Sequence, residues 1–65
     1  MFDFRNETMQ KISSAIRVLG KDLIGADQKR MIRAALRKVP EKEFLRDITI
    51  PPAWVQEIMI DIWNN

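Results

Sequence analysis

The first regular pattern of apolar positions lies in the N-terminal third of the chain. Apolar residues recur there at intervals of three and four, which places them on one stripe of a 3.6-residue helix. The stripe consists of Met9, Ile12, Ile16, Leu19 and Leu23. The pattern predicts an amphipathic helix over about 6–20, with Asp3 or Asn6 as its N-cap. Gly20 either ends this helix or lies on the buried stripe and lets a neighbour approach, with continuation to Ile24; we favour an end near Gly20.

A second amphipathic helix is predicted over about 26–39. Asp27 is favourable near a helix start, and Pro40 prevents the helix from continuing. The apolar face of this helix consists of Met31, Ile32, Ala35, Leu36 and Val39. The opposite face consists of Lys29, Arg30, Arg33 and Arg37.

The C-terminal part is predicted to hold a short helical turn and a third main helix. The turn spans about 41–47, and its expected apolar contacts are Phe44, Leu45 and Ile48. Pro51 then disfavours helix at Ile50, and the last helix is expected over about 52–63. Because seven of the ten residues in WVQEIMIDIW are apolar, we expect this helix to be covered on most sides.

These segments predict an all-α fold, a small bundle of three main helices plus the short turn. The segment ITI is too short to build a sheet, and we expect one domain over residues 1–65. A chain of this length buries only about 60% of the surface that its unfolded form exposes, so its stability as a monomer is expected to be marginal. Without cysteine or histidine, it needs very good helix packing, self-association or a partner protein.

The residue types argue against catalysis and against metal or cofactor binding. The chain has no His, Cys or Tyr, so neither Ser13 nor Ser14 has an imidazole to activate it. Glu57 and Asp61 lie one helical turn apart, which is more typical of a solvated helix edge than of an acid/base pair. We find no zinc ligands, calcium loop or phosphate-binding glycine loop, and expect no enzyme, no cofactor and no small-molecule substrate.

The sequence also shows no recognisable targeting signal. Its first ten residues hold three charges and no signal-peptide core, and no run approaches the roughly 20 apolar residues of a membrane span. We therefore expect a cytoplasmic protein with no membrane partner.

Charge is distributed unevenly along the chain. The formal net charge is only +2, but the second predicted helix carries five basic residues at its surface. These are Lys29, Arg30, Arg33, Arg37 and, at the helix edge, Lys38. They can contact nucleic-acid phosphates, an acidic protein or only solvent. Against specific nucleic-acid recognition, neither tryptophan lies near them in sequence, and the last helix has no basic residue.

Several apolar residues are left over once the core is assigned, which is typical of a protein interface. These candidates are Phe2, Phe4, Val18, Trp54, Ile60 and Trp63. The two tryptophans can equally be core anchors of a small bundle. The heptad-like spacing of the first helix lasts only two heptads, so it permits a coiled-coil homodimer without predicting one.

The leading hypothesis is a small non-enzymatic regulator or adaptor that acts by protein–protein interaction, either with another protein or as a homodimer. Compact helical chains without cysteine are common among phage, plasmid and bacterial accessory regulators, although this is an association only. The alternative is a nucleic-acid-binding protein that contacts phosphates through the basic face of helix 26–39.

Overall fold

The computed structural model describes residues 4–65, and this part of the chain is helical with no strand. Phe2 and the alternative N-cap Asp3 lie outside the described residues. The elements are α1 (Glu7–Leu19), the 3-10 turn η1 (Lys21–Leu23), α2 (Ala26–Leu36), α3 (Glu41–Asp47) and α4 (Ala53–Asn64). The all-α prediction is confirmed, but there are four α-helices instead of three, because the predicted turn is a seven-residue helix.

Both ends of α1 are fixed by single residues. The Asn6 side chain caps its start by accepting a hydrogen bond of 3.0 Å from the backbone N–H of Met9. Gly20 ends it, with φ 82° and ψ 159°, and donates its N–H to the carbonyl of Ile16 at 2.9 Å. Because α1 stops there, Leu23 leaves the apolar stripe and is 67% exposed, so its assignment to the core was wrong.

The second helix is three residues shorter than predicted. It ends at Leu36, and residues 37–39 form a turn in which the Lys38 and Val39 N–H groups each bond to a carbonyl three residues back, at 3.1 and 3.0 Å. Pro40 contributes to the difference, because it has no N–H to donate to the carbonyl of Leu36, which accepts from Val39 instead. Val39 is still buried, as predicted.

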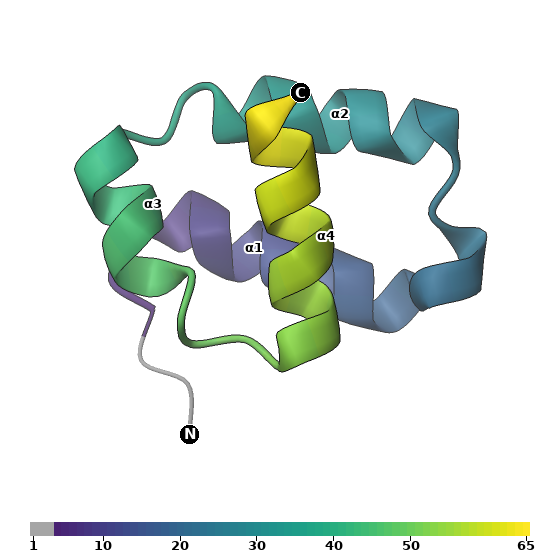
Figure 1. The fold of residues 1–65 in the computed structure, drawn as a ribbon, viewed down its shortest axis with the longest axis horizontal. Helices are drawn as coiled ribbons and strands as arrows, with labels where there is room; N and C mark the ends of the chain where they lie inside the picture. The colour runs from purple at the N-terminus through teal and green to yellow at the C-terminus, as the bar shows by residue number, and fades with distance from the viewer. Residues whose placement is uncertain (1–3) are drawn as a thin grey trace.

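The helix α4 lies across α1 and α2 in Figure 1, and it contacts both of them. The core formed between these helices, α3 and the adjoining turns comprises Met9, Ile12, Ile16, Ile32, Leu36, Val39, Phe44, Ile48, Val55, Met59 and Ile62. At the end nearest α3, the ring of Trp63 stacks on that of Phe44, with centroids 4.0 Å apart and planes 8° from parallel. Two residues predicted to be core contacts are exposed instead, Met31 at 73% and Leu45 at 60%.

A polar cluster joins the start of α1 to α3. The backbone N–H of Asn6 donates to Oδ2 of Asp47 at 2.9 Å, and its side-chain amide donates to Glu43 at 2.7 Å. Asp47 is buried, and Nε of Arg46 donates to its other oxygen at 2.8 Å. This Arg46 hydrogen bond, with a further contribution from the Asn6 N–H, holds the pKa of Asp47 below its ordinary value although burial opposes the shift.

We expect Gly20→Ala to destabilise the fold by about 1–3 kcal/mol, because its backbone geometry is one that only glycine adopts readily. No atom lies within 4 Å of the site of the added methyl group, so the cost is that of the backbone alone. Gly25→Ala is the control, since Gly25 has an ordinary φ of −94° and its new methyl group meets only the end of a flexible Gln28 side chain. Urea denaturation followed by circular dichroism measures the free energy of unfolding of both variants. An equal loss of stability in Gly20→Ala and Gly25→Ala would contradict this account.

We expect Asp47→Asn to lower the free energy of unfolding at pH 7 by about 1–3 kcal/mol, because a buried charge-assisted hydrogen-bond network is lost. The pKa of Asp47 is lower in the folded chain than its ordinary value of about 3.8, so its contribution is complete above that pH and fades as the pH falls through the lowered pKa. The gap between the parent and variant urea midpoints should therefore shrink on going from pH 7 to pH 3. Glu41→Gln, at an exposed position of α3, should show neither effect.

Candidate functional site

An apolar groove of about 270 Å³ runs between α1 and α2. Its lining comes from these two helices alone and consists of Thr8, Lys11, Ile12, Ala15, Met31, Ile32 and Ala35. Ile12 and Ile32 are core residues, only 6% and 7% exposed, and so form its floor. The groove is therefore continuous with the hydrophobic core beneath it.

The walls of the groove combine small side chains with one long, exposed one. Ala15 on α1 and Ala35 on α2 have only methyl groups, which leaves room for another chain to come close. Met31 lines the groove yet is 73% exposed. Methionine is flexible and adapts to irregular partner surfaces, so its exposure beside apolar walls is typical of a binding site.

Charged residues mark both ends of α2 on the side of Met31. At 3.6 residues per turn, Asp27, Met31 and Lys38 fall within about 40° of one another around the helix axis. Lys38 lies just past the end of α2. Because Arg37 before it keeps helical angles of φ −64° and ψ −19°, Lys38 continues the direction of the helix. Across the groove, Lys11 is already paired with Glu7 at 3.3 Å.

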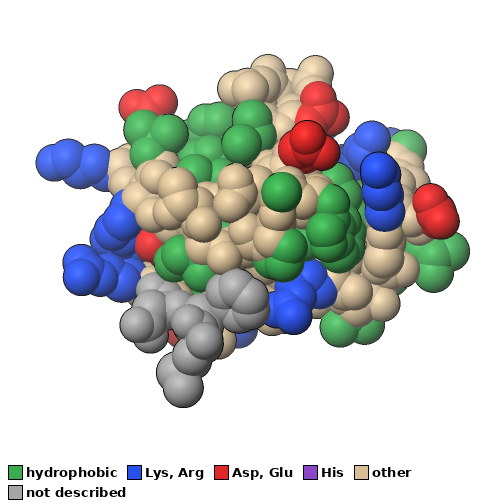
Figure 2. All heavy atoms as spheres, turned by 60° about the horizontal axis from the view of Figure 1, so that its bottom comes forward, with side chains coloured by type: hydrophobic (Ala, Val, Ile, Leu, Met, Phe, Trp, Pro, Cys, Tyr) green, Lys and Arg blue, Asp and Glu red, His purple; other side chains and the backbone are tan. Residues whose placement is uncertain are grey.

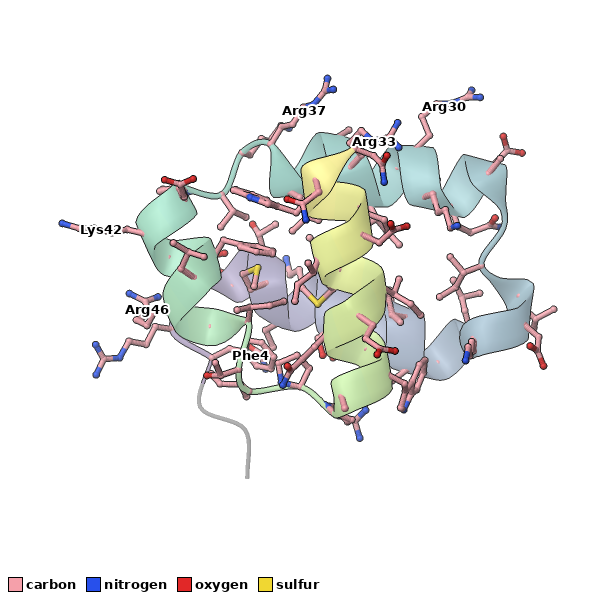
Figure 3. The ribbon with its side chains drawn as sticks, in the orientation of Figure 1. Phe4, Arg30, Arg33, Arg37, Lys42 and Arg46 are labelled. Carbon is pink, nitrogen blue, oxygen red and sulfur yellow. The ribbon has the colours of Figure 1, made fainter. Side chains whose placement is uncertain are left out.

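Most basic residues of α2 lie away from the groove, although Lys38 is on the side of Met31. Arg30, Arg33 and Arg37 follow its outer edge, and Arg30 and Arg37 point away from the molecule (Figure 3). The two ion pairs among residues 4–65 are Lys11–Glu7 and Arg46–Asp47, so none of the five predicted basic residues is in an ion pair.

Arg33 departs from its predicted place on the face opposite the apolar one. Its side chain is half-buried, and its buried Nε has no hydrogen-bond partner in the described part of the chain. Lys29, Arg30, Arg37 and Lys38 are exposed. The accessible basic face therefore has four members.

The predicted interface residues are not brought into one patch. Val18 is 85% exposed and lines a shallow hollow with Ser14 and Arg17, whereas Ile60 is 40% exposed on α4. Phe4, Trp54 and Trp63 are half-buried against the core. Hydrophobic side chains nevertheless reach the surface in several places, as the green areas of Figure 2 show.

The other features of the described residues are weaker candidates for a functional site. A larger hollow of about 490 Å³ lies near the start of α1 and is lined by Phe4, Arg5, Arg46, Asp47 and Ile50, but its buried carboxylate is already bonded to Arg46 and Asn6. Residues 4–65 hold no group of three His, Cys, Asp or Glu side chains arranged to bind a metal. None of the helices described is both long and apolar enough to span a membrane.

Comparisons of this chain with family models, with curated proteins and with solved structures find no match.

The groove was missed because Met31 was assigned to the core. It lies about 100° from Ile32 on the helix, at the margin of the apolar face, where periodicity does not separate buried from exposed positions. The placing of Asp27 and Lys38 on the same side as Met31 is the sequence signal that indicates an exposed position.

Proposed function

We propose that this protein is a small non-enzymatic regulator or adaptor, and that it binds an amphipathic helix of a protein partner in the α1–α2 groove. The observation that carries the proposal is the exposed Met31 side chain beside a groove whose floor is the hydrophobic core. A helix laid in such a groove buries apolar side chains of both partners, which is a common mode of peptide recognition.

Covering the groove with a partner helix is favoured over leaving it in water by the free energy of burying apolar side chains. Burying one methionine side chain contributes about 1.5–3 kcal/mol, and the small walls at Ala15 and Ala35 allow the close approach that this burial requires. The residue types support the non-enzymatic part of the proposal: Ser13 is buried without an imidazole in the sequence, and Glu57 and Asp61 are both exposed on α4.

Site-specific photocrosslinking in the source cells tests the proposal. A photoreactive amino acid in place of Met31 should crosslink to protein, and one in place of Leu45, an exposed apolar residue on α3, should not. Lys introduced at position 31 should weaken partner binding at least tenfold, and because Met31 is already exposed, the melting temperature should change little. Equal crosslinking from positions 31 and 45, or none from either, would rule out the groove.

A second candidate function is contact with nucleic-acid phosphates through the basic face of α2. The observation in its favour is that Lys29, Arg30, Arg37 and Lys38 are exposed and stand outside the two ion pairs of the described residues. Such a row acts mainly through release of counterions from the phosphates, so the affinity must fall steeply with salt.

Fluorescence anisotropy with labelled duplex DNA and RNA, at a series of salt concentrations, measures the affinity that tests this second candidate function. Four neutralised phosphates give a slope of about −3 to −4 in a plot of log affinity against log salt. Arg30→Glu combined with Arg37→Glu should abolish binding without unfolding the domain, whereas the exposed Lys21 of η1 can be reversed to Glu as a control. The absence of binding at low salt would exclude this function.

A further inference from the structure

We infer that the helix that occupies the α1–α2 groove is α2 of a second copy of this chain, packed antiparallel about a two-fold axis. This inference rests on the proposed function, because it names the partner of the same groove. It is carried by the order of residues along one side of α2.

The apolar part of this side is self-complementary. A two-fold axis that passes α2 between residues 32 and 33 puts Met31 of one copy opposite Ala34 of the other, and the reverse. Ala34 is exposed and Ala35 is half-buried, so small side chains stand where the long Met31 side chain of the second copy needs space. A long side chain facing small ones is the arrangement that lets two helices interdigitate.

The charges on the same side show the same symmetry. Asp27 lies before Met31 and Lys38 after it, eleven residues apart, or about 16 Å along a helix. Around the same axis, Asp27 of each copy faces Lys38 of the other, which gives two equivalent ion pairs. A parallel arrangement would instead place Asp27 against Asp27 and Lys38 against Lys38, which is unfavourable. The charge pattern therefore selects the antiparallel dimer.

The two charges are available for this role. Asp27 and Lys38 are both exposed, and neither belongs to the ion pairs that the described residues form. Each closed two-fold contact uses the same patch on both copies, so no second surface is needed. Arg30 and Arg37 point outward along the edge of α2, and the dimer leaves them accessible.

Sedimentation equilibrium of the full chain over a wide concentration range tests the inference. We expect a reversible increase in mass from 7.7 kDa to twice that value, with a dissociation constant in the micromolar range that suits a small interface. Met31→Lys should weaken self-association at least tenfold, and Leu45→Lys should leave it unchanged. Circular dichroism verifies that each variant is folded.

Charge exchange tests the register and the partner together. Asp27→Lys or Lys38→Asp alone places like charges opposite each other and should weaken the dimer about tenfold, since each exposed pair contributes only modestly. Combining the two substitutions in one chain should restore the parent affinity. Mixing the two single variants should give a heterodimer tighter than either homodimer. Asp22→Lys, an equal change of charge on η1, is the control.

The outcomes separate this inference from the proposed function. A chain that stays monomeric at all concentrations, yet crosslinks from position 31 to a different protein, overturns the dimer and leaves the groove as a binding site. A dimer that is indifferent to both Met31→Lys and the charge exchange forms elsewhere and also overturns the inference. A monomer that gives no crosslink from position 31 overturns both.

Discussion

The packing of α4 across α1 and α2 is the contact on which the rest of the structure depends. Val55, Met59 and Ile62 on α4 are at most 1% exposed, and the core residues of the other two helices pack around them. The chain has no cysteine, so no disulfide stabilises it, and a 65-residue domain has little other buried surface to draw on. The α1–α2 groove has no lining residue from α4 and remains open to solvent.

The α3 end of the bundle is held by a different kind of interaction. There, the stacked rings of Phe44 and Trp63 join α3 to α4, and Asn6 joins α3 to the start of α1 through Glu43 and Asp47. One asparagine thus caps α1 and joins its start to α3. Because the buried carboxylate of Asp47 is charged at neutral pH, this end of the molecule is the part most sensitive to acid.

The two candidate surfaces of α2 lie on different sides of the helix and overlap at Lys38. Met31, Ala35 and the flanking charges look along the groove with α1, while Arg30 and Arg37 point outward from the opposite edge. Protein binding at the first surface therefore leaves Arg30 and Arg37 free for phosphate, whereas Lys38 can serve only one of the two surfaces. A dimer through the groove would set two basic rows on one particle, which would strengthen any contact with a polyanion.

The helices and most of the core can be predicted from the sequence, because the spacing of apolar residues and the positions of glycine and proline act locally. Gly20 ends α1 where the sequence predicts, Pro40 limits α2 only to within three residues of its end, and buried residues such as Ile12, Ile16 and Leu36 lie where periodicity places them. Which residues at the edge of a helix's apolar face are buried depends instead on how the helices pack together. Met31 is exposed and Arg33 half-buried, although their places on the helix predict the reverse. The physical reason is that periodicity gives the direction of a side chain from its own helix axis, whereas its burial depends on which neighbouring helix lies in that direction.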